Sequence, residues 1–258
     1  MQFARRGAVL ALSDVSLEAV EQTAEQVRGL GAKAKAYRLD VADRAAVIEH
    51  AAQARSDFGK VNVIVNNAGV AVVGSVLATP WEEHDWIIGI NAHGVHNGTK
   101  AFLPHLIESG DGYVVNISSI EGLMSMPFLG SYNMSKFAVR GLTEALRQEA
   151  KALRWPIGVS SVHPGFVRTQ IAKSDPGQGH KAGIAELFNL LSFTDAATAA
   201  EAIVQGVGKR KARILVGADA RFYNAVPRLF GSLYSDPLGL IMRFAGVSFA
   251  RRKGVELR

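Results

Sequence analysis

Residues 113–136, YVVNISSIEGLMSMPFLGSYNMSK, contain the change of local structure that decides the fold. The first five residues form a short, largely apolar and β-branched run that ends at two serines, which predicts a buried strand. Residues 131–153 instead place Leu142, Leu146 and Ala150 at helical spacing, which predicts a long amphipathic helix. A buried strand that leads into a helix is the unit from which α/β proteins are built.

The same change repeats along the chain in both directions. Strands are predicted at residues 8–12, 33–39, 61–65, 113–117, 157–162 and 213–216. Helices are predicted at residues 16–30, 47–58, 80–107, 131–153 and 195–207, with Ser16 as a cap and Gly31 and Gly59 as helix ends. This alternation predicts an α/β fold, a Rossmann-like doubly wound parallel sheet with helices on both faces. The composition, 48% hydrophobic, predicts one domain over residues 1–258, with residues 217–258 as a helical C-terminal extension.

The composition also narrows the classes of function. The formal charge is +6 and the pI about 9.6, but basic residues are spread along the chain apart from residues 251–253, so no nucleic acid partner is expected. There is no cysteine and the histidines show no metal-ligand spacing, so neither a disulfide nor a metal site is expected. No apolar run reaches the roughly 18–20 residues of a membrane span. Residues 1–6 lack the apolar core of a signal peptide, and we expect a cytoplasmic protein.

Tyr132 and Lys136 lie four positions apart, so on the predicted helix they share one face. An ammonium roughly 4–5 Å from a phenol favours the phenolate by about 3–4 kcal/mol at an effective dielectric near 20. That predicts a tyrosine pKa lowered from about 10 towards physiological pH, where a general acid/base works best. A surface helix with a solvated lysine also contains such a pattern by chance, so the neighbouring residues must decide between the two interpretations.

Further motifs surround the pair in a fixed order. Residues 66–69 read NNAG after a predicted strand, Asn91 begins an NAHG segment, Ser119 precedes Tyr132, and residues 164–169 read PGFVRT. In this order and at these intervals, the chain resembles a classical short-chain dehydrogenase/reductase (SDR). The resemblance implies an NAD(P)-dependent oxidoreductase that transfers a hydride between a nicotinamide cofactor and a secondary alcohol or ketone.

The resemblance covers about residues 3–216 and implies a role for each matching residue in catalysis. Tyr132 is implied as the general acid/base, and Lys136 as the residue that lowers its pKa and holds the nicotinamide ribose. Ser119 is implied to hydrogen-bond the reacting oxygen, and Asn91 to anchor a water in the proton relay.

A set of cofactor-binding residues is also implied. Asp14 follows a predicted strand where a carboxylate can bond the adenosine ribose hydroxyls and repel a 2′-phosphate, so NAD is expected in preference to NADP. A charge at a helix N-terminus is the alternative role for Asp14. The other residues implied at the cofactor are Asp40, Val41, Asn66, Asn67, Ala68, Gly69, Tyr132, Lys136, Pro164, Gly165, Val167 and Thr169. For Asn66 and Asn67, a turn at the strand end is the alternative.

Substrate contacts are implied in two segments that are mostly apolar. The segment that begins at Ser119 contributes Leu123, Met124, Met126 and Phe128, and the segment after residues 164–165 contributes Ile171, Ile184, Leu187, Phe188 and Leu191. We therefore expect a hydrophobic secondary alcohol or ketone as the substrate. The alternative is that these side chains only pack a lid over the site.

One family feature is missing from the sequence. The family opens with a strand and a Gly-x-x-x-Gly-x-Gly turn, which lets the backbone approach the pyrophosphate, and residues 1–258 contain no such motif. Losing about five buried side chains of a central strand costs roughly 7–15 kcal/mol, which rivals the stability of a typical domain. We expect the first strand to be absent from the sheet and Met1 to be an internal methionine of a longer reading frame. The alternative function is an inactive fragment, or a non-enzymatic binding protein of the same fold.

The segment after residue 216 contains a second apolar region, at residues 238–247, before the basic residues 251–253. Packing against the core or a second subunit is the favoured interpretation, and peripheral contact with a membrane is the alternative. The family resemblance implies a homodimer or homotetramer.

Overall fold

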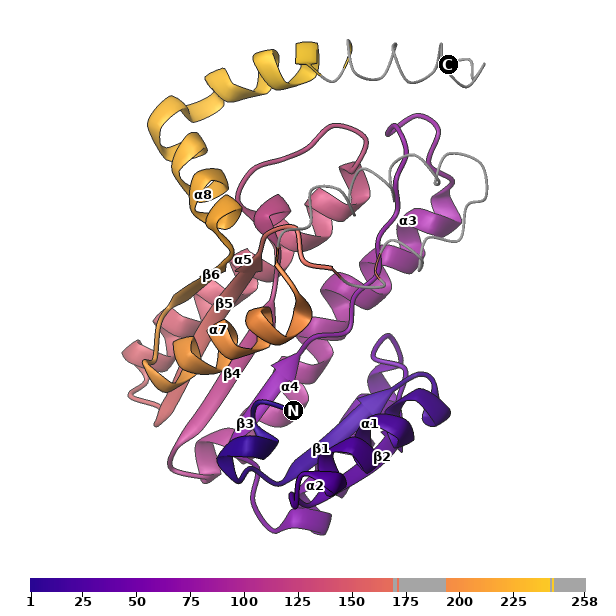
Figure 1. Ribbon diagram of the computed structural model, residues 1–258, viewed down its shortest axis with the longest axis vertical. Coiled ribbons are helices and arrows are strands. Elements are labelled where there is room, and N and C mark those ends of the chain that lie inside the picture. Colours follow the sequence, from indigo (N-terminus) through magenta and orange to yellow (C-terminus); the bar gives the residue numbers. More distant parts are fainter. Residues whose placement is uncertain (169–170, 172–193, 242, 244–258) are drawn as a thin grey trace.

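In the part of the chain that the structure describes, six strands alternate with helices (Figure 1). The structure is a computed structural model, and it describes residues 1–168, 171, 194–241 and 243. The strands are β1 (Leu10–Asp14), β2 (Ala34–Arg38), β3 (Val63–Asn66), β4 (Gly112–Ile117), β5 (Ile157–Pro164) and β6 (Arg213–Val216). The helices are η1 (Ala4–Arg6), α1 (Leu17–Gly29), α2 (Arg44–Phe58), α3 (Trp81–Ile88), η2 (Gly89–Gly94), α4 (Val95–Glu108), η3 (Ile120–Gly122), α5 (Gly130–Ala152), α7 (Ala196–Gly208), α8 (Ala218–Phe230) and η5 (Gly231–Tyr234).

Local sequence signals set the ends of the early helices as expected. Ser16 caps α1, and its hydroxyl accepts a hydrogen bond from the Ala19 backbone N–H. Gly31 and Gly59 have φ of +81° and +72°, the left-handed conformation in which glycine is unstrained. The predicted element order is confirmed, with one refinement: the helix expected over residues 80–107 is interrupted by the π-helical segment η2.

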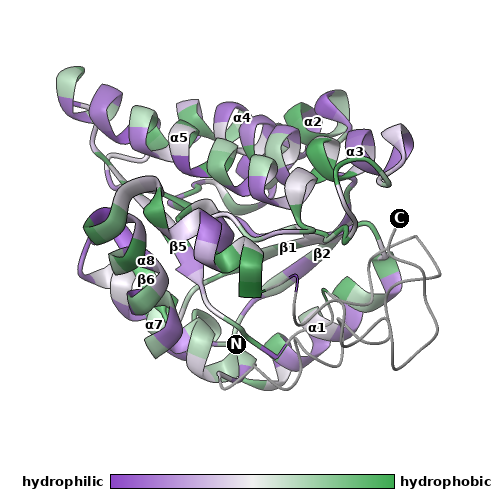
Figure 2. Cartoon of the chain, turned by 90° about the horizontal axis from the view of Figure 1, so that it is seen from above, coloured by the Kyte–Doolittle hydropathy of each residue, from purple (hydrophilic) through white to green (hydrophobic). Residues whose placement is uncertain are grey.

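The described strands run parallel, and helices cover both faces of the sheets. β3, β4, β5 and β6 are neighbours in that order, while β1 pairs with β2. Seen from above, α2, α3, α4 and α5 form one layer, and α1, α7 and α8 lie on the other side of the strands (Figure 2). The fold is therefore the doubly wound α/β architecture that the sequence predicts.

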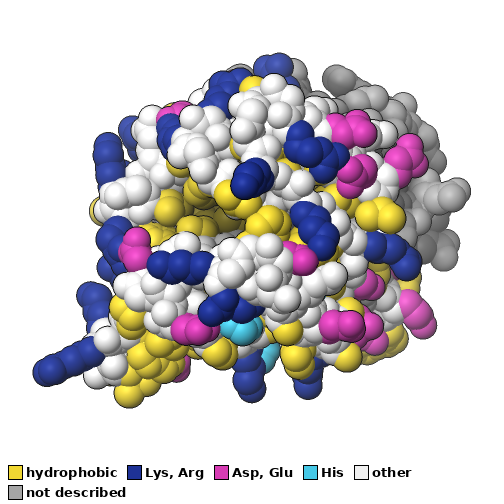
Figure 3. All heavy atoms as spheres, turned by 90° about the horizontal axis from the view of Figure 1, so that it is seen from below, with side chains coloured by type: hydrophobic (Ala, Val, Ile, Leu, Met, Phe, Trp, Pro, Cys, Tyr) yellow, Lys and Arg dark blue, Asp and Glu magenta, His cyan; other side chains and the backbone are white. Residues whose placement is uncertain are grey.

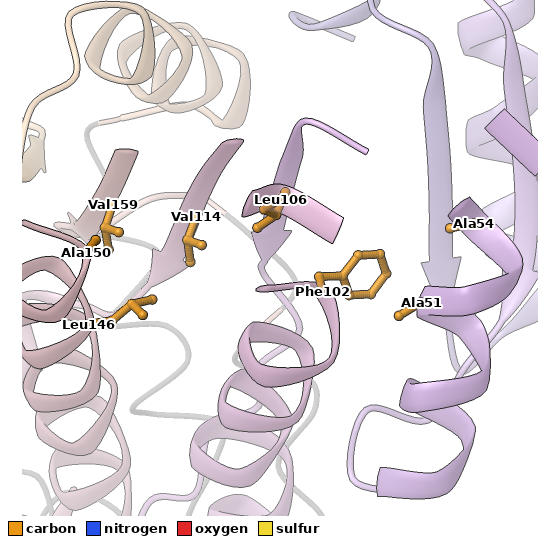
Figure 4. Packing of buried hydrophobic residues seen from close by; sticks show 8 residues of the cluster. All are labelled: Ala51, Ala54, Phe102, Leu106, Val114, Leu146, Ala150 and Val159. Carbon is orange, nitrogen blue, oxygen red and sulfur yellow. The ribbon is translucent and has the colours of Figure 1, made fainter. Parts of the chain in front are cut away.

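The strand pairing breaks between β1 and β3. Among the described residues, β1 pairs with β2 alone and β3 pairs with β4 alone, so they form a two-stranded and a four-stranded sheet. Side-chain packing joins the two sheets instead, because Ala51 and Ala54 of α2 share a cluster with Phe102 and Leu106 of α4 (Figure 4).

Two core clusters lie on opposite faces of the larger sheet because successive strand residues point to opposite sides. Val114 of β4 packs with Leu146 and Ala150 of α5 on one face (Figure 4). Val115, the next residue, packs on the other face in a cluster with Ala199 of α7. Both valines are fully buried.

After β6 the chain continues in α8 and η5, which lead away from the sheet (Figure 1). Phe222, Leu229 and Phe230 of α8 and Leu233 of η5 are exposed.

None of the described helices is long and apolar enough to span a membrane. On the face drawn in Figure 3, lysine and arginine side chains are scattered among acidic ones and do not gather into one basic patch.

Candidate active site

The start of α5 brings Tyr132 and Lys136 together. They lie on one face of the helix as expected, and the Lys136 Nζ is 5.5 Å from the centroid of the Tyr132 ring. Lys136 is buried, and its Nζ donates to the Ile117 carbonyl at the end of β4, at 3.3 Å. The lysine therefore connects the helix that bears the tyrosine to the carboxyl end of the central strand.

The charge balance of this pair differs from the expectation. Burial raises the pKa of Tyr132, the negative charge of Glu121 raises it further, and a hydrogen bond with Ser119 opposes both. Burial also lowers the pKa of Lys136 to about 8. The predicted lowering of the tyrosine pKa by the lysine is thus wrong for this structure, because burial disfavours both charged forms.

Ser119 lies immediately beyond β4 and is buried. Its hydroxyl hydrogen-bonds the Glu121 carboxyl group as well as Tyr132. Its backbone carbonyl accepts a hydrogen bond from Nδ1 of His163, at 2.8 Å, and Nε2 of the same ring contacts the Ser161 hydroxyl at 2.9 Å. Burial lowers the pKa of His163 to about 4, so a neutral ring holds the backbone of Ser119 in place.

Asn91 is fully buried within the π-helical segment η2, and segments of this kind are frequent at functional sites. Its Oδ1 accepts from the Val70 N–H at 2.8 Å, and its Nδ2 donates to the Val70 carbonyl at 2.9 Å and to the Ser135 hydroxyl at 3.1 Å. The side chain thereby connects the loop after β3 to α5. The predicted role in holding a water stays a prediction.

The residues predicted at the adenosine end lie at the carboxyl ends of β1 and β2, where ligands bind in open α/β sheets. Asp14 ends β1 and is exposed, and its carboxylate accepts from the Ser16 N–H at 2.9 Å. Asp40 accepts from the Ala42 N–H at 2.9 Å in the same manner. The carbonyl of Val41 accepts from Asn97 of α4 at 3.1 Å, which ties this loop to the larger sheet.

The loop after β3 runs beside the predicted catalytic residues. Asn67 and Ala68 are exposed. A Cβ on Gly69 would lie 3.3 Å from the Lys136 Nζ and 3.4 Å from the Asn91 Oδ1, so the glycine backbone passes close to both side chains. The fold therefore brings Gly69 to Lys136 and Asn91, and the cofactor-binding role of residues 67–69 stays a prediction.

Asn66 was expected along the cofactor path, and the structure contradicts this. Its Nδ2 donates to Asn116 Oδ1 at 2.8 Å and to Thr99 Oγ1 at 3.1 Å. The Asn116 Nδ2 continues the network to Thr143 of α5 at 3.0 Å. The Asn66 side chain points into this buried network because β4 and α4 offer polar partners there, and it holds β3 against both.

Pro164 ends β5, and the loop that follows carries Gly165 and Val167 and is fixed by α8. The Asp219 carboxylate accepts from the Phe166 N–H at 2.7 Å, and it lies so close to Gly165 that a Cβ there would overlap it. Val167 forms a bridge with Thr194. Thr169 lies outside the described residues.

The predicted substrate residues come from two segments, one that begins at Ser119 and one that follows residues 164–165. Leu123 and Met124 are buried, Met126 is half-buried, and Phe128 is exposed with a φ of 65°. Of the second predicted segment, Ile171 is half-buried. Ile184, Leu187, Phe188 and Leu191 lie outside the described residues.

Comparisons with known proteins show the family to which the chain belongs. The family model of the short chain dehydrogenases matches residues 1–178. The chain belongs to this family.

Among its relatives, the oxidoreductase SadH of Mycobacterium tuberculosis is 43% identical over 238 residues, which cover 91% of this chain and 86% of that protein. A solved short-chain dehydrogenase/reductase from Burkholderia phymatum in complex with NAD is 30% identical, with a TM-score of 0.79 over 85% of each chain. An alcohol dehydrogenase from Thermococcus sibiricus complexed with 5-hydroxy-NADP is 28% identical, with a TM-score of 0.63, and the match covers 75% of this chain and 86% of that chain. The chain is thus an SDR-family oxidoreductase, and these two structural neighbours hold NAD or a derivative of NADP.

Sequence reasoning missed three residues that shape the site of this dehydrogenase. Glu121, Asp219 and His163 were not singled out from the sequence. The signal for Glu121 was present, because an acidic residue two positions after Ser119 stands among apolar neighbours. Asp219 carried no such signal, since its contact with Phe166 spans the sequence between two separate elements.

Proposed function

We propose that this dehydrogenase transfers a hydride between NAD and a hydrophobic secondary alcohol or ketone, with Tyr132 as the general acid/base. The observation that carries the proposal is the meeting of three side chains at the end of β4. Tyr132 hydrogen-bonds Ser119, and Lys136 lies over the tyrosine ring. A positioned proton donor of this kind contributes about 10²–10⁴-fold to a rate.

The raised pKa of Tyr132 keeps the phenol protonated at rest. In the reducing direction the phenol gives its proton to the substrate oxygen, and in the oxidising direction the phenolate takes it back. Ser119 hydrogen-bonds the same oxygen and fixes its distance from Tyr132. The positive charge of Lys136 stabilises the phenolate that is left after the proton has moved.

The nicotinamide cofactor, when bound, supplies or accepts the hydride. Several features fit it: the Asp14 carboxylate at the end of β1 for the ribose hydroxyls, the glycine backbone at Gly69, and the buried ammonium of Lys136. The fit is incomplete at the pyrophosphate, because the sequence has no Gly-x-x-x-Gly-x-Gly turn. Asp14 supports NAD over NADP, since a carboxylate there repels a 2′-phosphate.

The apolar side chains of Leu123 and Met124 support a hydrophobic substrate. For the whole protein we propose a cytoplasmic homodimer or homotetramer with no nucleic acid partner. Light scattering coupled to size-exclusion chromatography tests the subunit number.

Tyr132→Phe tests the proposed function because it removes the hydroxyl and keeps the ring. We expect kcat to fall by about 10²–10⁴-fold while NADH binding, followed by energy transfer from the tryptophans, stays within about threefold. Unchanged turnover in Tyr132→Phe would overturn the role of the tyrosine.

A second measurement separates the enzyme from a non-catalytic binding protein of the same fold. NADH binding without turnover of any secondary alcohol or ketone would favour the binding protein. Asp14→Ala is expected to reduce the preference for NADH over NADPH, and equal preference in both variants would remove Asp14 from the cofactor site.

A further inference from the structure

Glu121 is a buried acid that the proposed mechanism does not use. It lies in η3, only 4% of its surface is exposed, and its carboxyl group hydrogen-bonds the Ser119 hydroxyl. No salt bridge to Glu121 occurs within residues 1–168 and 194–241. A carboxylate without an ion pair is costly to bury, so its presence beside Ser119 calls for a reason.

Charged and titratable groups of two helices face Glu121. Lys136 and Tyr132 approach from α5, and Asp219 and Tyr223 from α8. Burial, the largest cause, raises the pKa of Glu121, and the charge of Asp219 adds to it. The hydrogen bond from Ser119, the next largest cause, and the ammonium of Lys136 act in the opposite direction. The ionised form of Glu121 in turn raises the pKa of Tyr132 and of Tyr223.

Two other basic groups lie near this segment and bind its backbone. Arg140 of α5 donates to the Gly122 carbonyl at 3.4 Å. His163 of β5 contacts the Ser119 carbonyl at 2.8 Å. Both hold η3 in place, and neither is bonded to the carboxyl group of Glu121.

A serine hydroxyl has one proton to donate and can accept from two directions. An ionised Glu121 can only accept, so the proton of Ser119 must then point at the carboxylate. A protonated Glu121 can donate to the Ser119 oxygen, and the proton of Ser119 is then free to point elsewhere. The charge of Glu121 therefore decides what Ser119 offers to a substrate.

We propose that Glu121 is a positioning residue whose proton sets the direction of the Ser119 hydroxyl towards the reacting oxygen. The proposal rests on the proposed function of this site. With Glu121 protonated, Ser119 donates to a carbonyl oxygen, which is the arrangement for reduction. With Glu121 ionised, the proton of Ser119 points at the carboxylate, and Ser119 no longer donates to the reacting oxygen.

Protonation of Glu121 also acts on Tyr132. A neutral Glu121 removes the negative charge that opposes the phenolate, so the tyrosine gives up its proton more readily. Both effects favour proton donation to a carbonyl. No new reactant is needed, because the proton on Glu121 exchanges with solvent and is not consumed in the reaction.

The first test reads the protonation of Glu121 without any cofactor. Infrared difference spectra of the full chain are recorded over a pH series for the wild type, Glu121→Gln and Glu149→Gln. We expect a band from a protonated carboxylic acid that disappears as the pH rises and is missing from Glu121→Gln. Glu149→Gln makes the same change at an exposed glutamate of α5 and should keep the band.

A third variant reports on the contact with Ser119. In Ser119→Ala the acid has lost its partner, so the frequency of the band should shift while the protein stays folded by circular dichroism. The proposal is overturned if Glu121 gives no protonated band at pH values above the range in which exposed carboxyl groups titrate. It is also overturned if Ser119→Ala leaves the frequency of the band unchanged.

The second test is the pH profile of turnover. We expect kcat/KM for carbonyl reduction in the wild type to fall by about 10²-fold as Glu121 ionises, the loss typical of one missing hydrogen-bond donor to a reacting oxygen. In Glu121→Gln that step should vanish, because an amide does not titrate. A merely structural role for Glu121 would lower the rate equally at all pH values.

The outcomes distinguish this inference from the proposed function. If the wild type and Glu121→Gln turn over substrate with the same pH profile, the role of Glu121 is refuted and the proposed function stands. If NADH binds but neither protein turns over substrate, the proposed function fails and the role of Glu121 in the reaction fails with it.

Discussion

Acidification is expected to destabilise this dehydrogenase through His163. The ring is fully buried, its Nδ1 lies 2.8 Å from the Ser119 carbonyl, and its Nε2 lies 2.9 Å from the Ser161 hydroxyl. Because a carbonyl can only accept, Nδ1 carries the proton of the neutral ring and Nε2 accepts from the serine. Burial, the main cause, lowers the pKa of His163 to about 4, and the charges of Arg213 and Arg140 add to the effect.

The direction of the change in stability with pH depends on whether the native or the unfolded state binds the proton first. An unfolded histidine has a pKa of about 6.5, so as the pH falls the unfolded chain is protonated before the native protein. The contribution of His163 is complete above about pH 6.5 and is lost as the pH falls towards the native value of about 4. Between about pH 7 and about pH 5 this amounts to about 2 kcal/mol of the free energy of unfolding.

Urea unfolding followed by circular dichroism measures this free energy at each pH. His163→Asn keeps a donor for the Ser119 carbonyl and removes the titrating ring. It is expected to lower the stability at neutral pH by about 1–3 kcal/mol, since the Ser161 hydroxyl loses its acceptor. The test is how the free energy of unfolding changes with pH. Between about pH 7 and about pH 5, the wild type should lose about 2 kcal/mol more of this free energy than His163→Asn.

The matched control is His96→Asn, the same substitution at an exposed histidine, which should follow the wild type. Carboxyl groups that titrate near pH 4, and the other buried groups, are present in all three proteins and cancel in the difference. Equal slopes for the wild type and His163→Asn would refute the reasoning, because they would mean that His163 is solvated or charged in the native protein.

Three further changes test the packing. Gly98→Ala should destabilise the protein by about 1–3 kcal/mol, because its Cβ would overlap the Asn66 amide. Gly141→Ala has open space around the helix and should stabilise the protein by about 0.5–1 kcal/mol. The melting temperatures of the two variants should therefore shift in opposite directions. Leu106→Ala should cost about 2–5 kcal/mol in urea unfolding, since the side chain is fully buried in the cluster between the helices and the sheet, and a loss below about 1 kcal/mol would contradict that packing. Asp195→Ala removes the cap of α7, whose carboxylate accepts from the Thr198 N–H at 2.8 Å, and should cost about 1 kcal/mol; no change in the melting temperature would show that the cap is not formed.

The sequence alone predicted the order of strands and helices because the signals are local. Ser16 caps α1 through a residue three positions away, and Gly31 and Gly59 end helices through their own backbone conformation. The alternation of apolar runs and helical periodicity then required a parallel, doubly wound sheet. The spacing of Tyr132 and Lys136 placed them on one helical face for the same reason.

Only the tertiary structure decided the charges in the site. Burial raises the pKa of Tyr132 and lowers that of Lys136, which reverses what their spacing predicted, because spacing carries no information about desolvation. The inward turn of Asn66 likewise depends on partners from β4 and α4 that are distant in the sequence.

The same limit applies to the partners of Ser119. Its place before Tyr132 could be read from the sequence, but its contacts with Glu121 and His163 depend on how η3 and β5 meet. The sequence thus determined the order of the strands and helices and the spacing of Ser119, Tyr132 and Lys136. The tertiary structure decided which of their protonated forms are favoured, because burial and long-range contacts fix the relative stability of the charged forms.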